Sequence, residues 1–315
     1  MSGRLYSELD GARIFRVGLG CSNFGKRCDG ETAAGIVRAA LDAGINFFDI
    51  ADVYGEGTAE SLLARGLDGR RDEAFVATKF GHATKDARDP SQRGGHPENV
   101  IRSAEASLRA LRTDRIDLFQ LHEPDPDVPV AETLGALQTL VDQGKVRWIG
   151  CSNMSLAQVE EAHAAADERG VRPFDTVQNE YSLLVRDAEQ DMLPYCRRNG
   201  LRFIPFFPLA SGVLTGKYRM DQRVPEGSRV ARMKPDKLFR FFTPRALDLV
   251  ESLVEIGDRS GRSVLELALG FHLAEPAVLS VISGAMSPEQ VRANVAAAEA
   301  AADLRPDEVE LLRSL

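Results

Sequence analysis

The sequence predicts an α/β fold, a (β/α)8 TIM barrel with an N-terminal β-hairpin plug and extra C-terminal helices. Short apolar runs alternate with stretches whose apolar residues recur at helical spacing, the pattern of strands followed by amphipathic helices. Early strand starts recur roughly every 29 residues, the scale of a strand–helix–strand unit. Eight such units fit one barrel domain over residues 1–315. A doubly wound sheet is the alternative, but no GxGxxG motif lies between a first strand and helix.

An Asp-Gly pair near the start of the chain predicts the hairpin. Residues 4–9 and 12–17 flank Asp10 and Gly11. Asp-Gly suits a two-residue hairpin turn because it tolerates positive φ angles. A hairpin that precedes a barrel is expected to cover one of its ends.

The barrel elements follow in order. Predicted strands cover residues 17–22, 46–50, 74–79, 116–121, 146–151, 175–178, 201–206 and 278–283. Predicted helices cover residues 31–43, 59–67, 98–111, 130–143, 156–166, 187–198, 245–258, 264–273, 288–300 and 306–313. The first helix shows the reasoning: Ile36, Val37, Ala40 and Leu41 form an apolar stripe, and Gly44 then ends the helix as a left-handed cap. A long basic loop over residues 211–243 separates the seventh strand from the next helices.

Composition narrows the class of protein. The chain is 43% hydrophobic and 27% charged, as in ordinary globular proteins, and its net charge of −8 argues against a general nucleic-acid binder. Its four cysteines form no CxxC pair, which is typical of free thiols in a reducing compartment. The chain has no signal pattern and no apolar run long enough to span a membrane, so we expect a cytoplasmic protein. Its five histidines are dispersed, and we expect no metal site.

Ionisable residues stand at the ends of three successive predicted strands. Asp49 ends the second strand and Tyr54 follows on its loop, while Lys79 ends the third strand and His122 follows the fourth. In TIM barrels the chemistry lies at the C-terminal ends of the strands. One such residue alone is usually a satisfied polar group, but four proton-handling groups at neighbouring ends indicate a shared site.

These residue types suit proton transfer to a carbonyl oxygen. A tyrosine pKa of about 10 matches neutral pH poorly, and a nearby ammonium lowers it. We expect Lys79 to do this for Tyr54, with Asp49 holding Lys79 charged and in place. His122 would orient the carbonyl by a hydrogen bond while Tyr54 protonates it as hydride reaches carbon. No side chain donates hydride, so a cofactor must.

The chain resembles the aldo-keto reductase superfamily over almost its whole length. The matching stretches run in family order and are Phe48-Asp49, Tyr54-Gly55, Thr78-Lys79, Leu121-His122, 150–153, 178–181, 208–218 and 282–290. The 178–184 stretch and the long loop after Lys217 are more similar to the bacterial sugar-reductase and potassium-channel β-subunit branch. The resemblance implies a catalytic tetrad of Asp49, Tyr54, Lys79 and His122, with Tyr54 as general acid or base.

The resemblance also implies residues that bind a nicotinamide cofactor. Ser152, Asn153 and Gln178 would hold the nicotinamide amide, Phe206 would stack on its ring, and Lys217 would contact phosphate. The remaining expected cofactor contacts are Gly20, Cys21, Ser22, Phe207, Pro208, Leu209, Ser211, Gly212, Leu214, Arg229, Gly284, Met286, Gln290 and Asn294. Substrate contacts are expected from residues 81–95, Tyr181 and the loop after Phe206. Residues 84–95 are polar and would suit a sugar-like substrate.

The cofactor is expected to be NADP(H), with NAD(H) possible. Many relatives carry a cation for the 2′-phosphate where this chain has Met286. Arg229, in the long loop, resembles a second phosphate-binding arginine, although a solvated loop charge would look the same. Cys21 is another departure, because threonine is common at that position, and we assign it no reactivity.

Three functions compete. An NADP(H)-dependent aldo-keto reductase would act on an aldehyde, ketone or sugar carbonyl, with a small molecule as its partner and a homo-oligomer possible. A nicotinamide-binding regulator with slow turnover is the second reading. A TIM-barrel glycosidase, which needs two opposed carboxyl groups, is the third. Glu123 and Glu180 are its candidates, but it leaves Tyr54 and Lys79 without a role.

Overall fold

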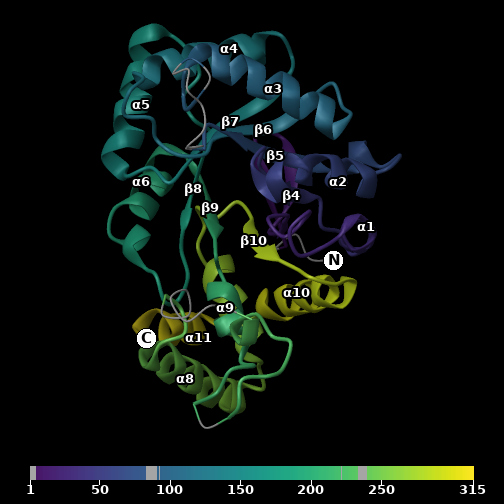
Figure 1. Cartoon of the computed structure of the whole chain (residues 1–315). Coiled ribbons are helices and arrows are strands. Elements are labelled where there is room, and N and C mark those ends of the chain that lie inside the picture. Colours follow the sequence, from purple (N-terminus) through teal and green to yellow (C-terminus); the bar gives the residue numbers. More distant parts are fainter. Residues whose placement is uncertain (1–4, 83–90, 92, 221, 233–239) are drawn as a thin grey trace.

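The barrel predicted from the sequence is confirmed (Figure 1). The computed structural model describes residues 5–82, 91, 93–220, 222–232 and 240–315. Within them, eight parallel strands form one sheet in the order β10-β3-β4-β5-β6-β7-β8-β9. These strands are β3 (Val17–Gly20), β4 (Phe47–Asp49), β5 (Phe75–Phe80), β6 (Ile116–Leu121), β7 (Val146–Ser152), β8 (Thr176–Glu180), β9 (Arg202–Phe206) and β10 (Val281–Gly284). Because the strands are parallel, their C-terminal ends meet at one mouth.

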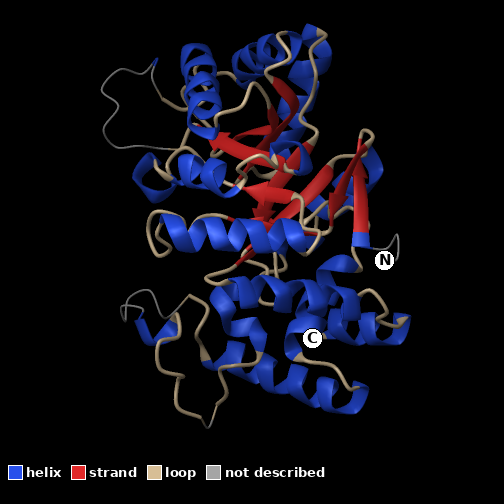
Figure 2. Ribbon diagram, turned by 90° about the vertical axis from the view of Figure 1, so that its right-hand side faces the viewer, coloured by secondary structure: helices blue, strands red, loops and turns tan. Residues whose placement is uncertain are grey.

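Helices flank the strands on the outside of the sheet (Figure 2). They are α1 (Gly30–Asp42), α2 (Ala59–Gly66), α3 (Pro97–Leu111), α4 (Val130–Asp142), α5 (Leu156–Arg169), α6 (Met192–Asn199), α8 (Pro244–Ser260), α9 (Val264–Leu273), α10 (Pro288–Ala301) and α11 (Pro306–Ser314). The predicted stripe of α1 is buried, and Gly44 follows the helix with a φ of 89°. Among the described residues, no helix is both long and apolar enough to cross a membrane.

The last strand begins three residues later than predicted, at Val281 rather than at 278, because the segment before it joins two strands. Phe203 of β9 donates its N–H to the carbonyl oxygen of Ala277, and Leu279 donates its N–H to the carbonyl oxygen of Phe203, both at 2.8 Å. From Val281 onward the chain pairs with β3 instead. The segment therefore passes from β9 to β3 and brings the sheet close to a closed barrel.

The predicted hairpin is present and covers the amino end of the barrel. Strands β1 (Tyr6–Leu9) and β2 (Ala12–Phe15) are antiparallel, and the turn places Asp10 at a φ of 44° and Gly11 at 81°. The hairpin contributes Leu9 and Ile14 to a cluster with side chains from the barrel strands, namely Phe47, Phe75, Ala77, Leu118, Trp148, Ile204 and Ile282. Apolar contact with these strands holds the plug in place.

One predicted helix is divided in the structure. The helix expected over residues 187–198 is a short 3-10 turn, η5 (Asp187–Glu189), followed by α6. Asp191 adopts a non-helical conformation between them, and its carboxylate accepts a hydrogen bond from the N–H of Met192. An aspartate competes with the helix by bonding to nearby backbone groups, so it starts a new helix here.

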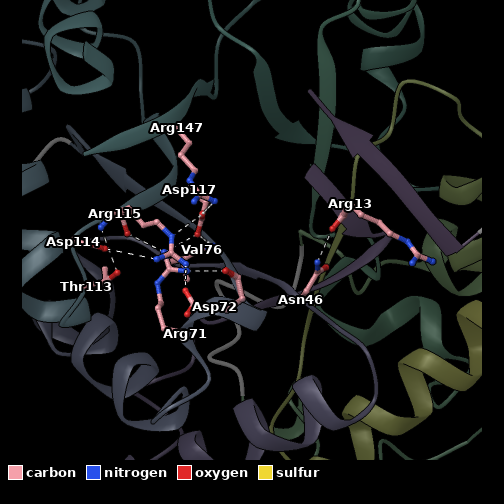
Figure 3. Close-up of polar contacts among 11 residues, drawn as sticks. Arg13, Asn46, Arg71, Asp72, Val76, Thr113, Asp114, Arg115, Asp117 and Arg147 are labelled. Atoms are coloured by element: carbon pink, nitrogen blue, oxygen red, sulfur yellow. Dashed lines mark hydrogen bonds and ion pairs between the residues drawn. The ribbon is translucent and has the colours of Figure 1, made fainter. Parts of the chain in front are cut away.

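A buried carboxylate near the amino ends of the strands, that of Asp117, is surrounded by arginines (Figure 3). Asp117, near the start of β6, has a side chain that is 3% exposed. Its Oδ2 accepts from Arg71 Nη2 at 2.7 Å and from the N–H of Val76 at 2.9 Å, while Arg147 Nη1 lies 3.3 Å from Oδ1. Asp117 thus joins the amino ends of β5, β6 and β7 through one carboxylate.

Candidate active site

The mouth of the barrel contains a buried ion pair between two neighbouring strand ends. Asp49 is the last residue of β4, and Lys79 is the penultimate residue of β5. Lys79 Nζ donates to both carboxylate oxygens of Asp49, at 2.7 and 2.8 Å, and to the carbonyl oxygen of Ile50 at 2.9 Å. Burial alone would lower the pKa of Lys79, but the Asp49 carboxylate and Tyr54 together outweigh burial and raise it. Lys79 therefore carries a positive charge at neutral pH although it is 1% exposed.

Tyr54 lies beside this pair on the loop after β4. It opens a 3-10 turn, η2 (Tyr54–Gly57), in which Gly55 has a φ of 57°. A Cβ on Gly55 would lie 2.4 Å from the carbonyl oxygen of Phe24, so only glycine fits the turn that carries the tyrosine. Lys79 Nζ lies 5.3 Å from the centroid of the Tyr54 ring.

Lys79 lowers the pKa of Tyr54 as expected, but the net pKa of Tyr54 is raised. Burial raises the pKa of Tyr54, and the positive charge of Lys79 opposes this without overcoming it. Lys79 thus acts in the expected direction, but the phenol remains protonated at neutral pH. A protonated phenol is the form that a general acid requires.

His122 completes the group. It follows β6, and its ring lies edge-on to that of Tyr54 with 5.9 Å between the centroids. Burial, followed by the charge of Lys79, lowers the pKa of His122 to about 3. Among the described residues, its buried Nδ1 has no hydrogen-bond partner. The structure therefore places Asp49, Tyr54, Lys79 and His122 together, with a neutral imidazole beside a protonated phenol.

The three residues expected to hold the nicotinamide amide have different environments. Asn153 is exposed after β7 with a φ of 58°, and its Nδ2 donates to Ser152 Oγ at 3.1 Å and to the carbonyl oxygen of His122 at 3.0 Å. Ser152 is buried. The amide nitrogen of Gln178 points elsewhere, because it donates to Asp49 Oδ2 at 2.8 Å and to Gln120 Oε1 at 3.3 Å. Through this hydrogen bond, Gln178 supports the Asp49 carboxylate.

The loop after β9 turns tightly through several left-handed residues. Phe207, Ala210 and Ser211 have φ angles of 51°, 45° and 59°, and Gly212 has 93°. The N–H groups of Ala210 and Gly212 donate to the carbonyl oxygens of Phe207 and Leu209, at 2.9 and 2.8 Å, and close these turns. A Cβ on Gly212 would lie 3.1 Å from Lys217 Nζ, so the ammonium covers this turn closely.

The other residues expected in this loop differ in accessibility. Phe206 and Leu209 are partly exposed and Phe207 is 36% exposed, whereas Pro208 is buried. Leu214 is fully buried, and its N–H donates to the carbonyl oxygen of Leu209. The expectation that Leu214 contacts pyrophosphate is therefore not supported for either its side chain or its amide. It packs in the core beneath the loop because the 3-10 turn η6 (Ala210–Thr215) directs it inward.

The expected adenosine end forms around the start of α10. Ser287 caps this helix, and Gln290 Oε1 accepts from the N–H of Met286 at 2.8 Å. Gly284 and Gln290 are exposed, but Asn294 is buried and donates to Ser283 Oγ at 3.0 Å. Met286 is partly exposed, with its sulfur 3.8 Å from Cys28 Sγ. The helix start offers N–H groups and a positive dipole to an anion, whereas Met286 adds no charge.

Arg229 has a buried donor nitrogen from which an anion could accept a hydrogen bond. Its Nε is buried and has no hydrogen-bond partner among the described residues. Burial, and next the charge of Arg27, lower the pKa of Arg229. A buried donor without a partner is costly, so a ligand that accepts from it would be favoured.

The remaining predicted cofactor contacts lie at the end of β3 and in the loop that follows it. Gly20 ends β3 and is buried, while Ser22 is exposed in the next loop. Cys21 is fully buried, and burial raises the pKa of its thiol. Cys21 therefore packs as a small apolar residue. Of the expected substrate contacts, Tyr181 is buried, and residues 83–90 and 92 lie outside the described part of the chain.

Asp52, an ionisable residue beside the tetrad, was missed in the sequence, and His82 was expected only as one of the substrate-loop residues 81–95. Burial raises the pKa of Asp52 to about 6, and its buried Oδ1 has no partner among the described residues. The ring of His82 lies 4.8 Å from that of His122, and His82 Nε2 lies 3.5 Å from Glu123 Oε1. Each follows a tetrad residue by three positions. Charged residues on the loops just beyond strand ends were the signal that could have revealed them.

The donor set fits a nicotinamide cofactor. Unpartnered buried nitrogens on His122 and Arg229, the ammonium of Lys217 beside the loop after β9 and the start of α10 provide separate sites for polar and anionic parts of one ligand. In the described ranges, no three His, Cys, Asp or Glu side chains gather in a way that could hold a metal ion.

Known proteins match this chain over nearly its whole length. A family model described as "Aldo/keto reductase family" matches residues 16–315. Aldo-keto reductase YhdN of Bacillus subtilis is 33% identical over 293 residues, which cover 90% of this chain and 85% of that protein. A probable voltage-gated potassium channel subunit beta of Arabidopsis thaliana is also 33% identical, over 90% of this chain and 87% of that protein.

A solved structure gives the same result. The glycerol dehydrogenase AKR11B4 from Gluconobacter oxydans has a TM-score of 0.81 and 28% sequence identity, and the match covers 99% of this chain and 95% of that one. The barrel fold, the residues at its mouth and these matches all indicate the same family. The chain belongs to the aldo/keto reductase family, a family of carbonyl-reducing oxidoreductases.

Proposed function

We propose that this protein is an NADP(H)-preferring reductase of aldehydes, ketones or sugar carbonyls, with Tyr54 as its general acid. The observation that carries this proposal is the contact between a protonated phenol, a buried ammonium and a neutral imidazole around Asp49. When bound, the nicotinamide cofactor supplies the hydride that no side chain can supply.

The four residues then have distinct roles. Tyr54 holds the proton and gives it to the carbonyl oxygen as that oxygen becomes an alkoxide. His122, being neutral, donates an N–H to the same oxygen and orients it. Lys79 stabilises the phenolate left on Tyr54, because its charge favours the ionised phenol. Asp49 keeps Lys79 charged and fixed, and Gln178 supports Asp49.

The preference for NADP(H) rests on two cations. Arg229 has a buried donor that lacks a partner, and Lys217 covers the left-handed turn at Gly212. An additional phosphate would satisfy both better than a ribose hydroxyl would. Since Met286 contributes no charge at the start of α10, NAD(H) remains an accepted cofactor in this proposal.

The two alternative functions are not equally well supported. The relatives named as potassium channel subunits keep a regulatory role as the second candidate, which low turnover would favour. The glycosidase reading has less support, because it leaves Tyr54 and the buried Asp49–Lys79 pair without a role. Burial raises the pKa of Glu180 although Arg240 opposes this, so Glu180 keeps one property of a general acid. We propose no nucleic-acid or membrane partner.

Oxidation of NADPH, and separately of NADH, with 4-nitrobenzaldehyde, methylglyoxal and an aldose tests this proposal. We expect turnover with at least one carbonyl and a higher kcat/KM with NADPH. Preference for NADH would keep the reductase and overturn the cofactor assignment. Tight binding of both cofactors without turnover would favour the regulator instead.

A further inference from the structure

A cavity lies at the amino end of the barrel, on the side away from the tetrad. It measures about 440 Å³ and is lined by Tyr6 and Ser7 of the hairpin, Arg16, Arg202 and the turn after α9. Arg16 precedes β3, and Arg202 is the first residue of β9. Its size lies in the range of small-molecule sites, roughly 300–1,000 Å³.

The two arginines of this cavity differ from the other arginines at the amino end. Asp117 pairs with Arg71 and Arg147, and Asp175 pairs with Arg172. Within the described ranges, neither Arg16 nor Arg202 makes an ion pair. Both have a buried Nε without a hydrogen-bond partner there.

The hydrogen bonds that Arg16 and Arg202 do make leave most of their donors unused. Arg16 Nη2 donates to the carbonyl oxygen of Glu275 at 3.2 Å, and Arg202 Nη2 donates to that of Val278 at 3.3 Å. A guanidinium has five N–H donors in a fork that matches phosphate or carboxylate oxygens. Both arginines line the same cavity, and burial, then the charge of Arg202, lower the pKa of Arg16.

The nearby carboxylates do not neutralise this pair. Glu275 is buried, but its Oε2 accepts from Arg197 Nη1 at 2.8 Å and its Oε1 from the N–H of Ala277 at 3.1 Å. Its attraction raises the pKa of Arg16 less than burial and Arg202 lower it. Glu8 also lines the cavity, but it is an exposed residue of β1. Two guanidinium groups therefore share a cavity without a dedicated counter-ion.

We propose that Arg16 and Arg202 form a binding site for a phosphate group at the amino end of the barrel. The phosphate oxygens would accept from the free donors of both forks, and such charge-assisted bonds are the strong ones. Leu273 and Pro276 add apolar wall beside the arginines, so the cavity has room for a small organic group attached to the phosphate. Inorganic phosphate and a small phosphate monoester are the two sources of this chemistry. The site does not depend on the proposed reductase activity.

Thermal unfolding and calorimetric titration of the full chain test the site. The probes are inorganic phosphate and glycerol 3-phosphate, with glycerol and sodium chloride of equal ionic strength as controls. We expect the phosphate compounds to raise the unfolding temperature of the wild type, and the two controls to leave it unchanged. The tighter binder of the two compounds identifies the source. No phosphate-specific shift in the wild type would overturn the proposal.

Variants locate the binding. In Arg16→Gln/Arg202→Gln we expect phosphate to bind about tenfold more weakly or not at all, because bonds to charged groups are lost. Arg147→Gln is the matched control, since it removes a half-exposed arginine of the amino end that lies outside the cavity and pairs with Asp117, and it should keep the wild-type affinity. Arg229→Gln tests whether phosphate binds at the mouth instead. If the double variant binds as the wild type does, or if Arg229→Gln alone abolishes binding, the site is elsewhere.

A second variant leaves both arginines in place, in case the double variant folds poorly. Pro276→Glu adds a carboxylate at an exposed position of the cavity wall. Its negative charge should weaken phosphate binding several-fold, whereas Pro276→Gln, without the charge, should not. Equal affinity in both Pro276 variants would contradict the proposed site.

Discussion

At the amino ends of the strands, Asp117 and Asp175 are held by arginines and backbone N–H groups of neighbouring strands, whereas at the carboxyl ends the buried Asp49 holds a lysine that faces the ring of Tyr54. Asp117 meets Arg71, Arg147 and a backbone N–H (Figure 3), and Asp175 meets Arg172 and the N–H of Ile149. At the mouth, His122, Asp52 and Arg229 each have a buried polar atom without a partner in the described part of the chain.

This difference separates stability from chemistry. Each carboxylate at the amino end joins neighbouring strands, so its removal leaves its partly buried arginine partners unpaired. Unpartnered groups at the mouth are costly to the folded state, and a bound ligand can satisfy them. We therefore expect substitutions at the mouth to act on turnover and those at the amino end to act on stability.

Lys79→Met should have the largest effect on both stability and turnover, because Lys79 forms a fully buried ion pair with Asp49 at the mouth. It leaves Asp49 buried and unpaired, which costs about 3–5 kcal/mol of unfolding free energy. It should also lower kcat on the order of 10² or more, since the phenolate on Tyr54 loses its cation. Urea unfolding and NADPH oxidation measure the two effects. Lys79→Met/Asp49→Asn should recover stability but not turnover, and recovery of both would contradict the role of Lys79.

Asp117→Asn tests the other end of the barrel. We expect a loss of roughly 3 kcal/mol in unfolding free energy, because Arg71 and Arg147 lose their carboxylate. The kcat should stay close to that of the wild type. Arg147→Gln is the milder control, since its side chain is 51% exposed and such a pair contributes about 1 kcal/mol or less. A large loss of kcat in folded Asp117→Asn would show that the two ends are coupled.

The pH dependence of stability should reveal the buried histidines. His272 is fully buried, and burial lowers its pKa from 6.5 to about 4. Between these values the unfolded chain binds a proton that the folded chain does not, so the free energy of unfolding falls as pH falls from 6.5 toward 4. The His272 contribution is constant above this window.

His272→Gln should reduce the fall in unfolding free energy between pH 6.5 and pH 4 by up to about 3 kcal/mol. Asp52 acts in the opposite direction, because its pKa is raised to about 6, but it is present in both proteins and cancels in the difference. Urea titrations at pH 4.5, 5.5 and 7 provide the comparison. An identical slope in both proteins would mean that His272 is not held neutral.

Met286→Arg should have the smallest effect. It adds a cation at the start of α10, where the 2′-phosphate is expected, and should raise the preference for NADPH over NADH by about tenfold. Fluorescence titration with each cofactor measures the ratio of the two Kd values. Met286→Leu should leave that ratio unchanged. An unchanged ratio in Met286→Arg would show that the adenosine end lies elsewhere.

The fold was predictable because each element has a local signal. Asp10-Gly11 specified the hairpin turn, Gly44 marked the end of α1, and the apolar runs marked the strands. One strand boundary was predicted wrongly because residues far away in the sequence decide where the strand begins. The later start of β10 depends on bonds to Phe203, which lies far away in the sequence.

The site was predictable in its members but not in its electrostatics. Strand ends located Asp49, Lys79 and His122 because parallel strands must meet at one mouth. The raised pKa of Tyr54 was not predictable, since it depends on how deeply the loop buries the phenol. The bond from Gln178 to Asp49 joins β8 to β4 across the barrel, and no local pattern encodes such a contact.

Tyr54→Phe tests the central claim most directly, because it removes only the hydroxyl that carries the proton. We predict that kcat for NADPH-dependent reduction of 4-nitrobenzaldehyde falls on the order of 10²–10⁴-fold. The Kd for NADPH and the urea midpoint should stay close to those of the wild type. A kcat equal to that of the wild type would contradict the assignment of Tyr54 as the general acid.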